Sequence, residues 1–250
     1  MENQNFSSDN YQNPIEIQST SAEVMSKTFT AKVFSWMFIG LGITGLVSYI
    51  FAATPTLIGA LLTQTATGGV SMSVLGWIVM LAPLGLVLLM GAGVNRLSYP
   101  AMIGVFFLFS ALMGMSLSFI FLAYTANSIF TIFLIAAAMF GAMAVVGYTT
   151  HTDLTSFGKL MIMLLIGIII ASVVNMFMHS ASFQYMLSFL SVAVFTGLTA
   201  YDVQKIKRIG GQINADGSTT GKYAISAALS IYLDFINLFL ALLRIFGNRR

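Results

Sequence analysis

The stretch SIYLDFINLFLALLRIF, Ser230 to Phe246, places an acidic residue, Asp234, inside a long apolar run. A second stretch, GLTAYDVQKIKRIG, Gly197 to Gly210, carries Asp202 at the end of another apolar run, before the chain turns basic. Only 8% of the 250 residues are charged, whereas globular domains carry roughly a quarter. Two of these scarce charges therefore lie within the most apolar segments, and their position needs an explanation.

The composition is that of an integral membrane protein. Hydrophobic residues make up 58% of the chain, and the mean hydropathy is +0.90. Cysteine is absent, which excludes disulfides, thiolate metal sites and a cysteine nucleophile. The net charge of +3 comes from basic residues at the ends of apolar runs, where lipid head groups and topology explain them. The expected partner is the lipid bilayer, and no nucleic-acid footprint is present.

The apolar runs predict seven transmembrane helices, since about 20 apolar residues cross a ~30 Å hydrocarbon core. They are too long and too uniformly apolar for the alternation of a membrane β-barrel. The predicted fold is therefore an all-α integral membrane protein. The seven runs are Val33 to Ala52, Val74 to Gly93, Ala101 to Ala123, Ser128 to Tyr148, Leu160 to Met178, Phe183 to about Lys205, and about Tyr223 to Phe246.

Basic residues occur on alternate connections, which predicts the orientation of the chain. They lie before the first run and between runs two and three, four and five, and six and seven, whereas the other three connections have none. The N-terminus should therefore be cytoplasmic. Seven crossings place Arg249 and Arg250 outside, against this rule. The last helix either crosses fully or is re-entrant, and we expect a full crossing.

The first 26 residues are polar and lack hydrophobic periodicity. They are expected to form a flexible cytoplasmic tail, residues 1–26, ahead of a transmembrane domain, residues 27–250. A basic start followed closely by a short apolar core is missing, so the segment is not expected to be a signal peptide.

The last predicted helix carries a small or polar stripe. Its members recur at intervals of three or four residues, which places them on one helical face: Ala227, Ser230, Asp234, Asn237, Ala241 and Arg244. Large apolar residues fill the other faces. Such a stripe should face protein or water rather than lipid, so this helix is expected to lie against or within the bundle interior.

The two acids are the main candidates for function. Asp234 lies ~16 Å into the predicted helix at 1.5 Å per residue, near the bilayer midplane, where an acid is costly and usually functional. If Asp202 approaches it from the preceding helix, the pair should titrate as a coupled unit. Ionised, the pair suits a hard cation such as calcium. Alternatively, each acid only caps a helix or forms a salt bridge, for instance Asp202 with Arg96 or Lys205.

Two further features leave alternatives open. Ser172, Asn175 and His179 share one helical face, and they either line an outer vestibule or hydrogen-bond to neighbouring helices. Pro83, with Gly85, should kink or loosen the second helix, either as a static bend or as a hinge.

The segments GLTAYDVQKIK and LSIYLDFINLFLALLRIFG resemble the signature segments of helices six and seven in the Bax inhibitor family, also called the lifeguard or transmembrane Bax inhibitor motif family. The short loops resemble those of bacterial members, which implies the bacterial inner membrane. The resemblance implies six helices around a central seventh and a pH-sensitive calcium leak sensed by an aspartate pair. Carried over by motif, that pair is Asp202 and Asp234, and Arg96 in GVNRLSYP matches an arginine that latches onto the first.

The resulting hypothesis is a passive calcium conduit gated by Asp202 and Asp234, with Ser230 and Asn237 beside the path and no resident organic cofactor. Calcium and protons would compete for the acid pair, which is also the predicted metal site. The alternative is a non-conducting membrane adaptor that modulates a membrane protease or stress and cell-death machinery, with residues 1–26 as its contact surface. An enzyme is not expected, because no zinc-ligand helix pattern is present.

Overall fold

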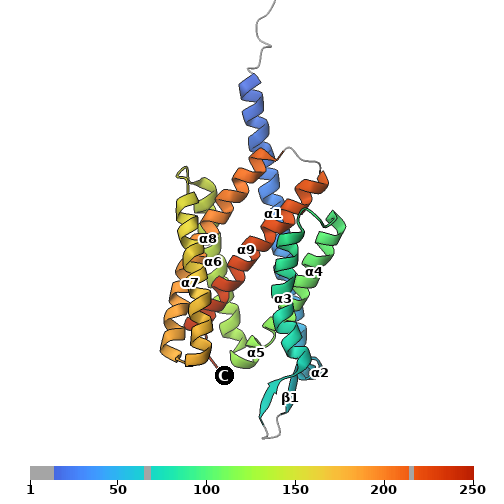
Figure 1. Ribbon diagram of the computed structural model, residues 1–250, viewed down its shortest axis with the longest axis vertical. Helices are drawn as coiled ribbons and strands as arrows, with labels where there is room; N and C mark the ends of the chain where they lie inside the picture. Colours follow the sequence, from blue (N-terminus) through green and yellow to red (C-terminus); the bar gives the residue numbers. More distant parts are fainter. Residues whose placement is uncertain (1–13, 65–68, 214–216) are drawn as a thin grey trace, which may run out of the picture.

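The computed structural model describes residues 14–64, 69–213 and 217–250 and is almost entirely helical in this part (Figure 1). The helices are α1 (Pro14–Ala53), α2 (Pro55–Ala60), α3 (Val74–Gly93), α4 (Tyr99–Leu117), α5 (Ile120–Ala123), α6 (Ala126–Thr149), α7 (Thr155–Met178), α8 (Ala181–Gln212) and α9 (Gly217–Phe246). Two short strands, β1 (Leu62–Gln64) and β2 (Val70–Met72), lie between α2 and α3.

Seven helical segments are long and apolar enough to cross a membrane, which confirms the predicted all-α membrane fold. The third of them combines α4 and α5. The main differences from the prediction lie at helix ends. At the end of the bundle that is predicted to be cytoplasmic, α8 extends to Gln212 and α9 begins at Gly217, several residues beyond the apolar runs. Helical backbone hydrogen bonds continue there although the side chains become polar.

The first helix also begins earlier than the apolar run indicated. Residues 1–13 of the predicted tail lie outside the described residues. Residues 14–26 are helical and continue into the first span, so the structure places no boundary at residue 26. Ser26 is buried, and its Oγ donates a hydrogen bond to the backbone oxygen of Lys207 on α8 (2.7 Å). The last turn before the predicted domain thus packs on the bundle.

The long connection between the first two spans contains structure that the sequence analysis did not predict. α2 begins with Pro55, whose fixed φ suits the first turn of a helix. β1 and β2 then pair as an antiparallel hairpin, with Leu62 opposite Met72 and Gln64 opposite Val70. The prediction against strands concerned the spans, and there it holds.

The C-terminus lies at the end of the bundle opposite to the basic connections (Figure 1). Two backbone hydrogen bonds attach it to the connection around α5, from Arg250 N to Ala123 O and from Thr125 N to Asn248 O (3.1 Å each). α9 therefore crosses the bundle fully, and the re-entrant alternative is wrong. Arg249 and Arg250 lie on the predicted outer side, against the charge rule.

Among the seven spans, α9 is the most deeply buried, and it packs against α8, α1, α6 and α4. Tyr232 fixes part of this packing. Its hydroxyl lies 2.8 Å from Thr44 Oγ1 on α1, which also donates to the backbone oxygen of Ser110 on α4 (2.8 Å). The Tyr232 ring meets Phe109 of α4 edge-on, with centroids 5.2 Å apart. One side of α9 is thus tied to two other spans.

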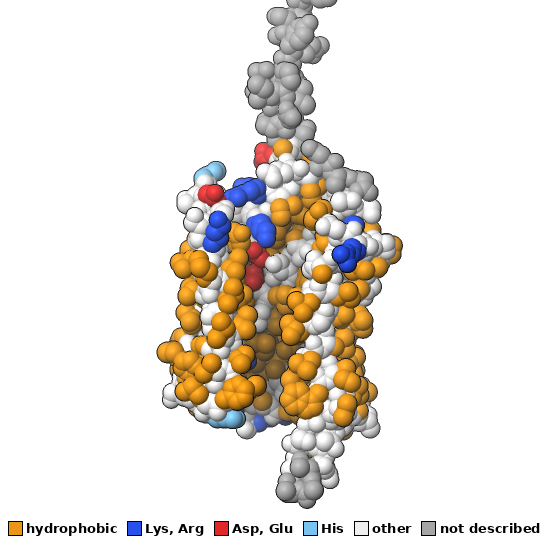
Figure 2. Space-filling view, in the orientation of Figure 1, with side chains coloured by type: hydrophobic (Ala, Val, Ile, Leu, Met, Phe, Trp, Pro, Cys, Tyr) orange, Lys and Arg blue, Asp and Glu red, His pale blue; other side chains and the backbone are white. Residues whose placement is uncertain are grey.

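The other side of α9 faces a groove. α3 packs mainly on α4, and α7 packs on α8, so these two helices form opposite walls while α9 forms the floor. Figure 2 shows this groove as a dark furrow along the middle of the molecule. The structure does not confirm the expected closed arrangement of six helices around α9.

Close contact between α6 and α8 depends on Gly147. A Cβ atom at this position would meet the backbone of Ala200, which cannot move aside as a flexible side chain can. At Gly141, on the same helix, a Cβ atom would point into open space and meet no neighbouring element within 4 Å. Replacing Gly147 and Gly141 in turn by alanine therefore separates the free-energy cost of a clash from the intrinsic effect of replacing glycine in a helix.

We predict that Gly147→Ala destabilises the protein by roughly 1–3 kcal/mol through overpacking and lowers the apparent Tm of the protein in detergent. Gly141→Ala should leave the apparent Tm unchanged or raise it slightly, because alanine favours the helix. Equal apparent Tm values for the two variants would contradict the close α6–α8 contact.

Candidate intramembrane acidic site

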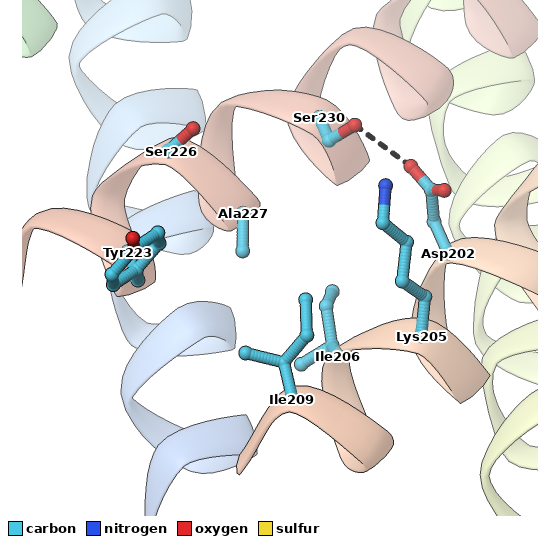
Figure 3. A pocket seen from close by; sticks show the side chains of 8 residues that line it. All are labelled: Asp202, Lys205, Ile206, Ile209, Tyr223, Ser226, Ala227 and Ser230. Carbon is cyan, nitrogen blue, oxygen red and sulfur yellow. Dashed lines mark hydrogen bonds between the residues drawn. The ribbon is translucent and has the colours of Figure 1, made fainter. Parts of the chain in front are cut away.

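Asp202 lies in a pocket between the cytoplasmic halves of α8 and α9 (Figure 3). Its carboxylate is half-buried, and Oδ2 accepts a hydrogen bond of 2.7 Å from Ser230 Oγ on α9. Lys205, three residues further along α8, points its amine toward this pair in Figure 3 and interacts electrostatically with Asp202. The carboxylate therefore has one hydroxyl donor and one nearby cation.

Small residues on α9 make room for this pocket. Ser226, Ala227 and Ser230 face α8 across it, while Ile206 and Ile209 form the opposite wall. Because α8 and α9 run antiparallel, the predicted small and polar stripe of α9 comes to lie beside Asp202. The local sequence of α9 thus provides both space and a hydrogen-bond donor for an acid on the neighbouring helix.

Asp234 lies one turn deeper than Ser230 on the same face of α9, about 6 Å further into the bundle at 1.5 Å per residue. Only 7% of its surface is exposed, and Oδ2 is buried without a hydrogen-bond partner. Asp202 is close enough to act on it electrostatically. The structure thus brings the two acids together across the α8–α9 hairpin, as the antiparallel arrangement predicted.

The residues expected beside Asp234 have different partners. Ser230 bonds to Asp202 instead. Asn237 lies on the groove one turn toward the outer side, and its Nδ2 donates to the backbone oxygen of Leu233 (2.8 Å). The Asp234 carboxylate consequently has no hydrogen bond to either of its predicted neighbours.

The pocket and the groove share Ser230 as a lining residue. The pocket extends from Ser230 toward Lys205 and the cytoplasmic side, and the groove extends past Asp234 and Asn237 to Arg244 near the outer end of α9. Polar side chains therefore follow one face of α9 through most of the membrane thickness. This track is the structural counterpart of the stripe seen in the sequence.

Arg96, the predicted latch, is exposed in the turn between α3 and α4. Its backbone N donates to Gly93 O (2.9 Å). Within residues 14–64, 69–213 and 217–250, the ion pairs are Lys27 with Glu23 and Arg208 with Asp153, so Arg96 does not engage Asp202 in this conformation. The latch stays a prediction.

The polar residues at the end of α7 do not act together. Ser172 lines the groove. Asn175 is buried, and its Oδ1 accepts from Ser180 N (3.2 Å) in the short connection to α8. His179 has a left-handed backbone (φ 52°), and its Nδ1 lies 3.1 Å from Phe177 O. The three residues therefore neither line one common vestibule nor form hydrogen bonds that join neighbouring spans.

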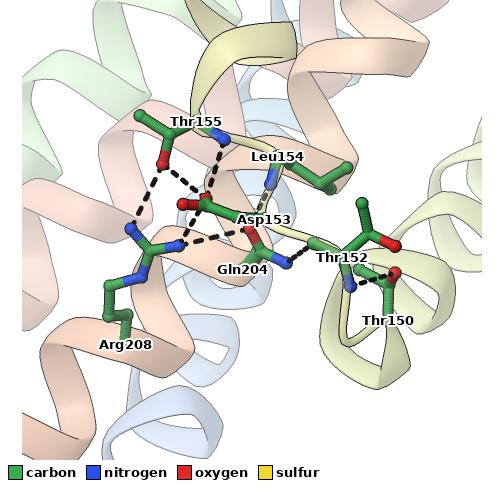
Figure 4. Close-up of polar contacts among 7 residues, drawn as sticks. All are labelled: Thr150, Thr152, Asp153, Leu154, Thr155, Gln204 and Arg208. Atoms are coloured by element: carbon green, nitrogen blue, oxygen red, sulfur yellow. Dashed lines mark hydrogen bonds and ion pairs between the residues drawn. The ribbon is translucent and has the colours of Figure 1, made fainter.

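Beyond Asp202, the cytoplasmic end of α8 holds the α6–α7 connection in a polar network (Figure 4). Gln204 accepts from Leu154 N (2.9 Å) and donates to Thr152 O (2.8 Å). Arg208 donates to Asp153 (2.9 Å). Hydrogen bonds from Thr155 and from Arg208 lower the pKa of Asp153 to about 2. The sequence gives no local signal for this network, because its partners are about 50 residues apart.

No group of three or more His, Cys, Asp or Glu side chains is close enough to hold a metal ion in the described part of the chain. The acid pair alone offers two carboxylates, fewer than the six to eight oxygen ligands that calcium takes. A cation at this position would need water or backbone oxygens for the rest of its coordination shell.

These features define a class: a seven-span helical membrane protein with an acid pair on two neighbouring spans. The family model "Inhibitor of apoptosis-promoting Bax1" matches residues 26–250. The chain is 45% identical over 225 residues to inner membrane protein YbhL of Escherichia coli, and the aligned residues cover 90% of this chain and 93% of YbhL. The chain belongs to the Bax inhibitor family.

Two further relatives agree. An uncharacterized protein of Borreliella burgdorferi is 43% identical over 94% of this chain and 99% of its own length. A membrane protein of Streptococcus pyogenes is 38% identical over 92% of this chain and 96% of its own length. The similarity to the inner membrane protein YbhL, together with the seven apolar helices, makes the chain a multi-pass protein of the bacterial inner membrane.

We predict that Gln204→Ala lowers the apparent Tm in detergent, because it leaves Leu154 N and Thr152 O without their partner. A typical hydrogen bond of this kind contributes roughly 0.5–1.5 kcal/mol. Gln212→Ala, the same change at an exposed position near the end of α8, is the matched control and should have little effect. Comparable losses of apparent Tm for both variants would show that Gln204 does not hold the connection.

Proposed function

We propose that this protein is a pH-sensitive passive conduit for calcium, with Asp202 and Asp234 as the pair that meets both the ion and the proton. The observation that carries the proposal is the Asp234 carboxylate, buried near the middle of a membrane span with Oδ2 unpartnered and beside a second acid. A buried carboxylate in this setting is costly, and a structural role would ordinarily provide it with donors.

The chemistry of the pair supports competition between calcium and protons. Two carboxylates in a poorly solvated site repel each other, and either a shared proton or a divalent cation removes that repulsion. Calcium is then cargo that passes the site, with water and the oxygen atoms of Ser230 and Asn237 as further ligands. Membership of the Bax inhibitor family agrees with this interpretation.

The groove indicates how such a conduit could close. α3 and α7 form its two walls, and their approach would complete a ring of six helices around α9. Pro83 lies inside α3 next to Leu84, which lines the groove, so a bend at this position would move that wall. Engagement of Asp202 by Arg96 at the cytoplasmic end of α3 would couple this movement to the acid pair.

The test is calcium flux from liposomes that contain the purified protein, measured across a range of pH. We predict that Asp202→Asn and Asp234→Asn each lower the flux about tenfold or more, because loss of one carboxylate removes a few kcal/mol of attraction for calcium. Each change should also flatten the pH dependence, since the coupled site is lost.

Asp153→Asn is the matched control for this experiment. It makes the same substitution in the exposed α6–α7 connection, away from the track, and should preserve both flux and pH dependence. If both intramembrane variants retain the flux and the pH profile of the unmodified protein, the conduit proposal is wrong.

One observation favours the second candidate, a non-conducting adaptor for a membrane protease or for stress and cell-death machinery. The cytoplasmic extension of α1 exposes the apolar side chains of Val24 and Met25, to 57% and 38%. An exposed apolar helix face at the end of a span is a surface that a protein partner can cover.

Deletion of residues 2–25 removes Val24 and Met25 and so separates the two candidates, and it retains Ser26, whose hydrogen bond to α8 holds α1 in place. We predict that the truncated protein keeps its calcium flux and its pH dependence, because the acid pair and the groove are untouched. Loss of flux from a truncated protein with an unchanged apparent Tm would count against the conduit as proposed.

A further inference from the structure

The outer half of the groove is apolar and open to the bilayer. Its walls and floor come from α3, α7 and α9 and include Leu84, Ile168, Ile169, Val173, Met176 and Leu240. The wall residues Leu84 and Met176 are 62% and 63% exposed. In a membrane, this space must be filled by hydrocarbon, because an empty apolar gap forfeits the dispersion contacts of its lining.

The outer end of the groove carries one cation, Arg244, in the last turn of α9. Its side chain is exposed, and among the described residues no ion pair or hydrogen bond engages its guanidinium. It lies ten residues beyond Asp234, about 15 Å along the helix, which is half the thickness of the hydrocarbon core. Arg244 lies two residues before the end of α9, so its long side chain can extend to the outer lipid head groups.

We propose that the groove binds one phospholipid of the outer leaflet, with its phosphate on the Arg244 guanidinium and one acyl chain along the groove toward Asp234. The guanidinium suits this role because its planar donor set matches phosphate in a bidentate fashion. The positions of the cation and of the apolar walls together fix the orientation of the lipid.

Two polar groups that line the outer half, Asn237 on α9 and Ser191 on α8, are hydrogen-bonded within their own helices. Asn237 Nδ2 is satisfied by Leu233 O (2.8 Å), and Ser191 Oγ donates to Leu187 O (2.7 Å). Each of these groups therefore keeps one hydrogen bond within its own helix when hydrocarbon covers it, which lowers the cost of covering it relative to an unpaired group. Asp234 Oδ2 lies at the inner limit of the groove, beyond the expected reach of the chain.

The inner half of the track is unsuited to the same ligand. Its cation, Lys205, already faces the Asp202 carboxylate, and a lipid phosphate there would meet that negative charge. Arg244 has no acid beside it in the described part of the chain. The difference in charge assigns the lipid to the outer leaflet.

A bound lipid would have a consequence for the proposed conduit, and this step alone rests on that proposal. The acyl chain would separate the walls formed by α3 and α7 and shield Asp234 from the bilayer. Binding of the lipid itself is independent of calcium flux and can be tested without it.

The experiment measures binding of dioleoylphosphatidylglycerol to the full-length, delipidated protein in detergent by native mass spectrometry, with dioleoylglycerol as the probe that lacks a phosphate. We expect one phosphatidylglycerol bound per chain and weaker binding of dioleoylglycerol. Arg244→Gln should weaken phosphatidylglycerol binding about tenfold, since a charge-assisted contact is lost. Arg249→Gln removes a neighbouring outer arginine that does not line the groove and should change little.

A second pair of variants tests the acyl chain. Leu84→Trp fills the groove and should abolish binding, whereas Leu88→Trp, one turn along α3 and equally exposed at 65% but outside the groove lining, should not. Equal affinity for phosphatidylglycerol and dioleoylglycerol would overturn the proposal. So would equal effects of the two arginine changes on binding, or equal effects of the two tryptophan changes. Apparent Tm values confirm that each variant is folded.

Discussion

The cost of placing an ionisable carboxylate near the middle of a membrane is the constraint to which the rest of this structure responds. Asp234 lies on the most deeply buried span, and one of its oxygens has no hydrogen-bond partner. A single carboxylate at this depth costs several kcal/mol, and the nearby Asp202 adds repulsion rather than relief. The surrounding helices must therefore supply enough stability to hold α9 in position despite this cost.

The stability comes from one side of α9, which is packed against other spans, while the opposite side carries the polar residues. On one side, Tyr232 links α9 to α1 and α4 through Thr44 and an aromatic contact with Phe109. This dry, close-packed side fixes the height and rotation of the helix. The opposite side presents the acids and small residues to a pocket and a groove. Because rotation about the helix axis is fixed by the packed side, the polar side cannot turn away from α8.

Much of this could be predicted from the sequence, because the bilayer imposes a strong length rule and the scarcity of charge makes each polar residue informative. The seven spans and the stripe containing Asp234 followed from periodicity and run length alone. The β1–β2 hairpin did not, since three-residue strands give too little pattern. The hydrogen-bond partner of Ser230 could not be predicted either, because the packing of α8 on α9 places its hydroxyl on Asp202. Contacts between distant residues, such as Gln204 with the α6–α7 connection, leave no local signal.

The same stripe of α9 changes its chemistry along its length, and the change follows the depth of the membrane. At the cytoplasmic side, Ser230 and Lys205 surround Asp202 with a donor and a cation. At the middle, Asp234 has neither. Further out, Asn237 is satisfied within its own helix, the groove walls become apolar, and the stripe ends in Arg244, a cation without an acid beside it in the described chain. The side chains between the cytoplasmic side and Asp234 therefore suit a hydrated ion. Those between Asp234 and the outer surface suit hydrocarbon. For a conduit as proposed, passage of an ion through the outer half would require that hydrocarbon be displaced, and the outer half of the groove, rather than the acid pair, would then be the larger barrier in this conformation.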